Sequence, residues 1–250
     1  MDRLYVRRFV IVLATSATTI FLAVTGGRTQ TAGPGIKTDP KINEPFKNPD
    51  LKGFIKKFES DDREVFARRN EIVAALELKP GMAVADVGAG TGLFTRLFAD
   101  QVGPSGKVYA IDIAPGFLKH IAADAAKRGQ KQVVTVVGTQ DSINLPRASV
   151  DLVFLCDVYH HLETPEKNLS SIRRALRERG RLVVIDFDRV EGKSTDFVLK
   201  HVRASQRVFR QEIEAAGFTF LPATKLPRLS ETFFLQFETT SSAPKAAIQK

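Results

Sequence analysis

The chain is poor in the residue types that build sulfur-based sites, with one cysteine, two methionines and no tryptophan among 250 residues. The lone Cys156 excludes an intrachain disulfide and any metal site made of several cysteines. It lies in an apolar run, so we expect a packed and unreactive thiol. Without tryptophan, a Trp-lined cage for methylated amines cannot form, although Tyr and Phe remain available. Internal repeats, coiled-coil heptads and His/Cys metal spacing are also absent, so the pattern predicts no metal site.

The remaining composition is that of one enzyme-sized domain. Hydrophobic residues make up 43% and charged residues 26% of the chain, which is long enough to bury one substantial core. The formal net charge of +9 fits attraction to an anionic membrane or an acidic substrate. The basic residues form no dense run and no recognition module is visible, so a nucleic-acid partner is not expected.

The first forty residues differ from the rest. Arg3, Arg7 and Arg8 precede an uncharged apolar and hydroxyl-rich stretch at residues 9–24, which is followed by a polar segment containing Gly and Pro. This order is typical of a secretory signal peptide, and the stretch is short for a membrane span, which needs about 20 apolar residues. An uncleaved anchor, a transit peptide and a buried N-terminal helix are alternatives. Location stays open between export and membrane attachment.

We therefore predict three regions: a signal or anchor segment with its linker at 1–40, a catalytic domain at 41–240 and a flexible tail at 241–250. Within the domain, short apolar strands alternate with helices, a pattern that indicates a parallel sheet covered on both faces. Strands are expected near 83–88, 107–112, 133–138, 150–156, 181–187, 218–221 and 232–237. Helices are expected around 65–76 and 197–216 and after each of the first five strands, with the third in doubt.

The most informative stretch is VADVGAGTGLFT, in which Gly88, Gly90 and Gly92 follow an apolar run and open a helix. Glycine allows a sharp turn and a close approach between backbone and ligand, and free N–H groups at a helix start favour an anion. A dinucleotide fingerprint needs a third glycine where this chain has Leu93. The spacing instead resembles motif I of the class I S-adenosylmethionine-dependent methyltransferases. A tight turn without a ligand is the structural alternative.

Four further stretches support this resemblance, which runs from about residue 63 to residue 237. KVYAIDI ends in Asp112, VVTVVGTQDS carries Asp141, SVDLVFLCDVYHHL looks like motif IV, and RALRERGRLVVIDF resembles the helix, turn and fifth strand that close the core. The resemblance implies a Rossmann-like three-layer α/β sandwich. Its seven-stranded, mostly parallel sheet would have the order 3-2-1-4-5-7-6, with the last strand antiparallel.

The resemblance also implies S-adenosyl-L-methionine as cofactor. Asp112 would accept the ribose hydroxyls, Asp141 would lie near the adenine amino group, and Asp157 would bind the methionine amine or cap a helix. The residues predicted to bind the cofactor are Asp86, Gly88, Ala89, Gly90, Thr91, Gly92, Asp112, Ile113, Thr139, Gln140, Asp141 and Asp157.

The exit of the fourth strand is where the resemblance places the acceptor. We predict His160 as the base or orienting group, because histidine titrates near neutral pH, and Tyr159 as a contact to substrate or cofactor. The alternative is that one of the two adjacent histidines only supports the start of a helix. Residues 42–61, rich in Phe and Lys, match a segment that the family often uses as a lid, although the helical spacing of the phenylalanines favours a packed helix with a solvated lysine face.

The predicted function is methyl transfer from S-adenosylmethionine to a small-molecule acceptor, apolar or anionic, by in-line displacement with S-adenosylhomocysteine as product. Two alternatives remain at this point. One is a non-catalytic S-adenosylmethionine-binding protein. The other is a nicotinamide-dependent oxidoreductase, which Leu93 disfavours because the dinucleotide fingerprint has a glycine at that position. The acceptor atom and the oligomeric state are not predicted.

Overall fold

The computed structural model describes residues 37–222 and 227–239, which belong to one compact unit. The predicted signal or anchor stretch at residues 9–24 and the tail at 241–250 lie outside the described residues. Within the part that is described, no helix is long and apolar enough to cross a membrane.

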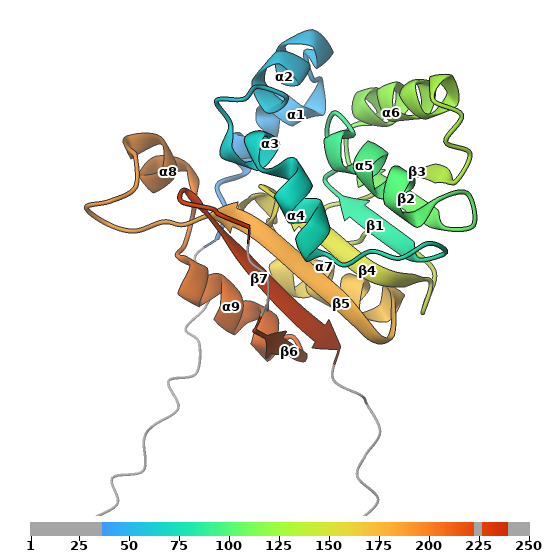
Figure 1. Cartoon of the computed structure of the whole chain (residues 1–250). Helices are drawn as coiled ribbons and strands as arrows, with labels where there is room; N and C mark the ends of the chain where they lie inside the picture. The colour runs from blue at the N-terminus through green and yellow to red at the C-terminus, as the bar shows by residue number, and fades with distance from the viewer. Residues whose placement is uncertain (1–36, 223–226, 240–250) are drawn as a thin grey trace, which may run out of the picture. The chain divides into compact units, whose positions relative to one another are not determined.

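A seven-stranded sheet forms the centre of the domain (Figure 1). Its strands are β1 Ala83–Val87, β2 Lys107–Asp112, β3 Val133–Val137, β4 Val150–Cys156, β5 Leu176–Phe187, β6 Phe218–Leu221 and β7 Thr232–Thr239. Their order is β3-β2-β1-β4-β5-β7-β6, and β7 runs antiparallel to both β5 and β6. The predicted fold class, strand order and antiparallel last strand are therefore confirmed.

Helices cover both faces of the sheet, because successive side chains of a strand point to opposite sides. In β1, Val84 packs with α4 Arg69–Ala75 and α5 Leu93–Val102, while Ala85 belongs to the core on the other face. The first face also carries α6 Pro115–Lys127, and the second carries α7 Pro165–Ala175 and α9 Gln206–Ala215 (Figure 1). All five residues of β1 are buried, which suits the central strand of a parallel sheet.

Three predicted elements differ from those observed. The helix expected at 65–76 is two helices, α3 Glu64–Ala67 and α4, and the one expected at 197–216 is α8 Asp196–His201 and α9. Between α8 and α9 the chain is extended at Val202, which is buried in the core, and hydrophobic spacing alone does not reveal such a break. Strand β5 begins at Leu176, five residues earlier than expected, and a register shift against β4 accommodates the extra length.

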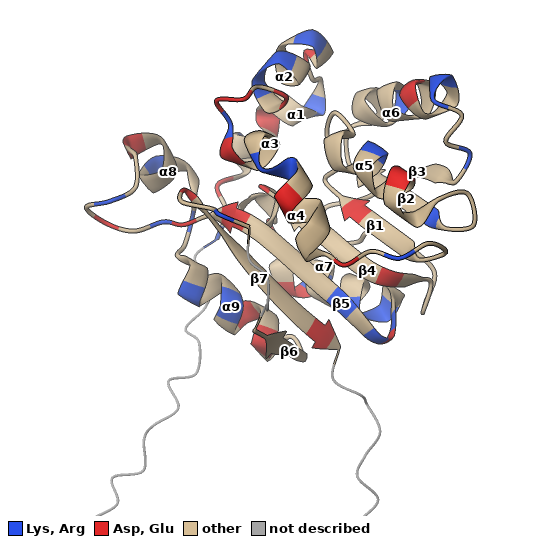
Figure 2. Cartoon of the chain, in the orientation of Figure 1, with Lys and Arg blue, Asp and Glu red and all other residues tan. Residues whose placement is uncertain are grey.

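The segment before α3 forms η1 Pro40–Asn43, α1 Glu44–Lys47 and α2 Leu51–Phe58. These three elements are called the lid below. Their aromatic rings make a chain that reaches α6: the centroids of Phe46 and Phe54 lie 5.2 Å apart, and Phe54 lies 5.1 Å from Phe58 and 5.4 Å from Phe117. Basic and acidic residues are interspersed over the helices (Figure 2), as expected for a protein without a dense basic face.

Candidate active site

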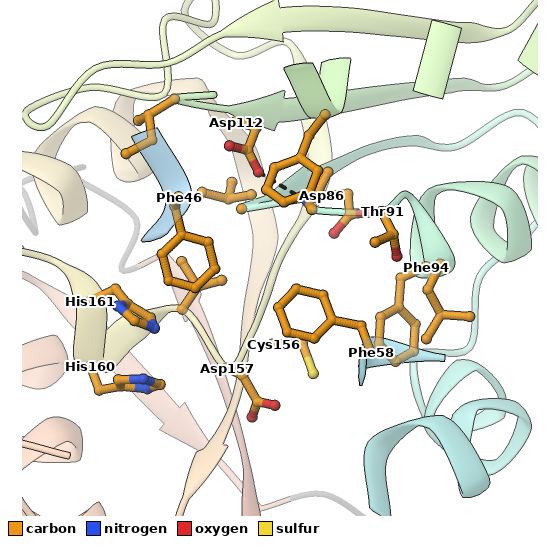
Figure 3. A pocket seen from close by; sticks show the side chains of 18 of the residues that line it. Phe46, Phe58, Asp86, Thr91, Phe94, Asp112, Cys156, Asp157, His160 and His161 are labelled. Atoms are coloured by element: carbon orange, nitrogen blue, oxygen red, sulfur yellow. Dashed lines mark hydrogen bonds between the residues drawn. The ribbon is translucent and has the colours of Figure 1, made fainter. Parts of the chain in front are cut away.

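A cavity of about 720 Å³ lies at the carboxyl ends of β1, β2 and β4, beneath the lid. Its volume is in the range of small-molecule sites, and its place is where open α/β sheets bind ligands. Eleven of the predicted site residues line it: Asp86, Gly88, Ala89, Gly90, Thr91, Asp112, Ile113, Thr139, Gln140, Asp157 and His160. Figure 3 shows the acidic and aromatic side chains that surround the space.

The glycine loop between β1 and α5 has the backbone conformation that its sequence predicts. Gly88 has a φ of +68°, and a Cβ there would lie 2.4 Å from a methyl carbon of Val158. Gly90, with a φ of +53°, donates its N–H to Asp112 Oδ2 at 2.9 Å. Side chains at these positions would strain the loop, so glycine keeps open backbone facing the cavity.

Gly92 has a role in helix packing. It does not line the cavity, and a Cβ on it would lie 2.8 Å from Ile121 Cγ1 of α6. Its φ of +79° places it at the N-cap of α5. In the structure this glycine allows the start of α5 to pack closely on α6, while its predicted cofactor contact stays a prediction.

Asp112 is held rigidly at the end of β2. Its Oδ1 accepts the N–H of Ala114 at 2.8 Å, and its Oδ2 accepts the N–H of Gly90 at 2.9 Å. Burial raises the pKa of this carboxyl despite these hydrogen bonds. Each carboxylate oxygen accepts more than one hydrogen bond, so the side that faces the cavity keeps acceptor capacity for two neighbouring hydroxyls. The residue fits a ribose.

Asp86 lies at the end of β1, next to the glycine loop. It is 4% exposed, and its Oδ2 accepts the hydroxyl of Thr95 at 2.6 Å. Burial, with a smaller contribution from the charge of Asp112, raises its pKa to about 7. A carboxyl of this kind favours a cationic group in the cavity, which would restore its ordinary ionisation.

Replacing Asp86 by Asn is expected to change how stability depends on pH. The pKa is about 7 in the folded protein and 3.8 ordinarily, so the unfolded chain releases the proton first. The ligand-free protein therefore loses stability as the pH rises from about 4 to about 7. Asp86→Asn keeps an oxygen for Thr95 and removes this loss, so the melting temperature of the variant relative to that of the wild type should rise as the pH increases from about 4 to about 7. A constant difference across that range would contradict the assignment.

Asp157 follows β4 in a left-handed backbone conformation with a φ of +54°. Its Oδ2 pairs with Arg63 Nη2 at 2.6 Å, while its buried Oδ1 has no hydrogen-bond partner. Burial raises the pKa of Asp157, although the charge of Arg63 opposes the shift. An orphaned buried carboxylate oxygen at a cavity wall fits an ammonium ligand. The sequence indicated no role for Arg63, because its partner lies 94 positions away.

Asp141 lies apart from the predicted site residues that line the cavity. Its carboxylate accepts from Lys167 Nζ at 2.8 Å and from the hydroxyl of Thr164 at 2.7 Å, and it lies at the surface outside the cavity lining. This lysine and threonine hold the side chain away from the cavity. The neighbouring Thr139 and Gln140 do line it, so the loop after β3 borders the site without its acidic residue.

His160 has the geometry of a buried base. Its Nδ1 lies 2.6 Å from Asp186 Oδ1, and its backbone N–H donates to Asp186 Oδ2 at 3.1 Å. Because the carboxylate only accepts, Nδ1 carries the hydrogen, and Nε2 is left buried without a partner. Burial opposes the charged imidazolium, but the charge and hydrogen bond of Asp186 outweigh it, so the pKa of His160 is raised.

Asp186, at the end of β5, is a site residue that sequence reasoning missed. It is 0% exposed and also accepts the N–H of Phe187 at 2.8 Å. A charged residue that ends the apolar run LVVI was the available signal. The partner of that charge cannot be read from the run, because His160 lies 26 positions earlier.

Tyr159 does not line the cavity, although it was predicted to contact substrate or cofactor. The side chain is 0% exposed and packs edge-on against Phe209, with centroids 4.9 Å apart. Its hydroxyl donates to Glu212 Oε2 at 3.1 Å. In the turn after β4, His160 and His161 line the cavity, whereas Tyr159 packs into the core.

The lid forms the remaining wall. Phe46, Phe58, Lys56 and Lys57 line the cavity, so the segment is both a packed set of helices and a cover. Just after α2, Glu59 accepts from Thr91 Oγ1 at 2.8 Å and from Arg96 Nη2 at 2.7 Å, which anchors that end of the lid on α5.

Polar contacts anchor the start of the lid as well. Thr38 donates its hydroxyl to the carbonyl oxygens of His160 and Leu162, and Asn43 donates to that of His161.

Cys156, which was predicted to be a packed thiol, is half-buried and lines the cavity. Burial raises the pKa of this thiol well above its ordinary value, so it remains neutral.

Comparison with known families gives one match: residues 85–184 match the methyltransferase domain family. Among curated relatives, the ubiquinone/menaquinone biosynthesis C-methyltransferase UbiE of Bordetella avium is 30% identical over 118 residues, which cover 47% of this chain and 46% of that protein. The malonyl-[acyl-carrier protein] O-methyltransferase of Methylococcus capsulatus is 30% identical over 148 residues, covering 56% and 53%. The chain thus spans about half the length of these relatives.

Among solved structures, a SAM-dependent methyltransferase from Aquifex aeolicus is similar to this chain with a TM-score of 0.66 and 26% identity. The likeness covers 77% of this chain and all of that one. The likeness therefore extends well beyond the residues matched by the family.

Proposed function

We propose that the chain is a class I S-adenosylmethionine-dependent methyltransferase that transfers a methyl group from S-adenosylmethionine to a small, apolar acceptor, with S-adenosylhomocysteine as the product. The match to the methyltransferase domain family and the likeness to a SAM-dependent methyltransferase support this proposal. S-adenosylmethionine, when bound, supplies a methyl group that its sulfonium has already activated. The protein then has to bind and orient the reactants, exclude water and move a proton.

The residues of β1, β2 and β4 fit the cofactor. The open backbone of Gly88 and Gly90 accommodates a ligand at close approach, and Asp112 offers its carboxylate to the ribose hydroxyls. Asp86 and the orphaned Oδ1 of Asp157 present negative charge to the cationic methionine end. Thr139 and Gln140 border the place left for the adenine.

One observation carries the chemical part of the proposal: His160 Nε2 is buried, lacks a partner and belongs to a residue that lines the cavity, while Nδ1 is held by Asp186. This is the arrangement of a general base whose tautomer is set by a carboxylate. His160 takes the proton from the attacking oxygen or carbon of the acceptor, and Asp186 stabilises the imidazolium that forms. The lid excludes water from this step.

The acceptor end of the cavity is aromatic and carries histidines and lysines. Phe46, Phe187 and Phe197 line it together with Lys57, which suits an apolar ring with an acidic hydroxyl or C–H group. One relative is named a C-methyltransferase and the other an O-methyltransferase, so both atoms agree with the comparisons. We propose an acceptor whose carbon or oxygen becomes nucleophilic when it loses a proton.

The test uses the purified full chain, S-adenosylmethionine with a labelled methyl group and an extract of the source cells. Mass spectrometry of the products should find the label on a small apolar molecule, and wild-type protein without the extract is the control. Binding of S-adenosylhomocysteine without any transfer would favour the non-catalytic alternative. Competition by a reduced nicotinamide cofactor for the same site would favour the oxidoreductase.

Membrane association through residues 9–24 would bring the site to an apolar acceptor dissolved in a lipid bilayer. That stretch lies outside the described residues, and the net charge of +9 is the feature that supports the idea. Fractionation of cells that carry a C-terminal tag tests it, since recovery of the whole protein in the soluble fraction would contradict attachment.

A further inference from the structure

Three of the four histidines in the chain meet at the acceptor end of the cavity. His160 and His161 belong to η2 Tyr159–His161, the turn after β4, and His201 ends α8. The ring centroids of His160 and His161 lie 4.1 Å apart, and His201 lies 5.1 Å from the first and 5.2 Å from the second. Figure 3 shows the two adjacent imidazoles side by side. This group is called the histidine cluster below.

Two of the three imidazoles are oriented by a hydrogen-bond acceptor at Nδ1. Asp186 holds Nδ1 of His160 at 2.6 Å, and Asn43 Oδ1 lies 2.8 Å from Nδ1 of His161. In each case the oxygen accepts a hydrogen bond from Nδ1–H, so the free lone pair of the imidazole is on Nε2. An imidazole whose far nitrogen is bound by a carboxylate or amide oxygen is the usual support of a metal ligand. A second observation also points to a bound ligand: the buried Nε2 of His160 has no hydrogen-bond partner.

The charges around the cluster are mixed. Lys57 adds positive charge near His161 and His201, whereas Asp186 behind His160 supplies negative charge.

We propose that His160, His161 and His201 bind one divalent transition-metal ion at the acceptor end of the cavity when no acceptor is bound. The ion would occupy the Nε2 lone pair of His160 that the proposed base uses, so methyl transfer belongs to the metal-free state. One nitrogen from each ring lies within 4.8 Å of the other two. Zinc–nitrogen bonds of about 2.0–2.1 Å in a tetrahedron need nitrogens roughly 3.4 Å apart, so the rings draw together on binding. His201 ends a short helix of six residues, Asp196–His201, and is half-buried, so it is the ring with room to move.

Three neutral nitrogen ligands select zinc or a neighbouring first-row ion over magnesium or calcium, which prefer oxygen. Three protein ligands also leave a coordination position open, as catalytic zinc sites do. Metal binding needs neither S-adenosylmethionine nor methyl transfer, and a protein that proves inactive can still show it.

Titration calorimetry of the tag-free full chain with Zn²⁺ tests the proposal. We expect one ion per chain, with binding weakened at least tenfold in His201→Ala and in His161→Ala, since losing even a supporting partner of a ligand costs 10–100-fold. His120→Ala is the matched control, because His120 lies on α6 outside the cluster, and its affinity should equal that of the wild type.

A spectroscopic measurement covers the case in which a variant folds poorly. Co²⁺ bound by three imidazoles in the wild type should give visible absorption bands that Zn²⁺ abolishes at one equivalent. His201→Gln, at the half-buried end of α8, should lose these bands while its far-ultraviolet circular dichroism stays unchanged. Absence of saturable Zn²⁺ binding by the wild type, or equal affinity in the wild type and His201→Ala, would overturn the proposal.

Discussion

His160→Ala is expected to lower kcat by about 10²–10⁴-fold, the usual contribution of a positioned general base. The loss follows from the absence of a substitute: Nε2 of His160 is the orphaned nitrogen at the acceptor end, and the neighbouring His161 has a pKa lowered to about 2. The affinity for S-adenosylhomocysteine should change little, since Asp112 and the glycine loop form the other end of the cavity. Single-turnover kinetics and calorimetry separate these two effects.

The pH profile provides an independent check on the same residue. The base works only when neutral, and Asp186 raises its pKa above the ordinary value of 6.5. Activity should therefore fall as the pH drops through that raised pKa. Asp186→Asn removes the charge that stabilises the imidazolium, so the profile of this variant should shift to lower pH while kcat falls at its optimum.

Asp186 is a positioning residue, because it acts through the imidazole. A merely structural role would lower kcat without moving the pH profile. Turnover by His160→Ala at the wild-type rate would remove the residue from the mechanism, and an unshifted profile in Asp186→Asn would remove its partner.

Asp112→Ala is expected to weaken binding of S-adenosylmethionine by about 1–3 kcal/mol, which corresponds to roughly 5–150-fold in Kd. The carboxylate is the acceptor at the end of β2 that faces the cavity, and water cannot replace it without losing the alignment set by Gly90 and Ala114. Asp112→Asn should lose part of the same affinity, because an amide has one oxygen and cannot accept both backbone N–H groups as the carboxylate does.

Calorimetry with S-adenosylhomocysteine measures the change, and Asp141→Asn is the matched control. Asp141 is also an acidic residue in the loop region after a strand, but it pairs with Lys167 outside the cavity, so its loss should leave Kd unchanged. Wild-type affinity in Asp112→Ala, with a normal melting curve, would refute the ribose assignment. Weakened binding in Asp141→Asn would support the predicted contact between Asp141 and the adenine of the cofactor.

Local patterns were sufficient for the framework of this protein. Strand positions, the glycine turn at Gly88 and Gly90 and the order of the sheet follow from apolar runs, glycine spacing and the family resemblance, and the structure confirms the fold. These features depend on residues close together in the chain or on rules of parallel connections. Asp112 was predicted at the end of a strand, and its carboxylate lies at the cavity for that reason.

Other predicted details required three dimensions. Tyr159 and His160 are adjacent and polar, yet one is buried against Phe209 and the other lines the cavity. Gly92 and Asp141 both belong to stretches that line the site. Gly92 packs against α6, however, and the side chain of Asp141 binds at the start of α7. A strand or loop position predicts which edge of the sheet a residue reaches, but the direction of its side chain depends on what packs beside it.

The sequence by itself therefore determined the positions of the strands and the glycine turn, because short-range periodicity and glycine conformations encode them, and the family resemblance supplied the order of the sheet. Only the tertiary structure decided the partners: Asp186 for His160, Arg63 for Asp157 and His201 for the histidine cluster. The members of each set come from different elements and lie 26 to 94 positions apart in the chain. Contacts of this kind come from the packing of elements, which a single sequence does not display.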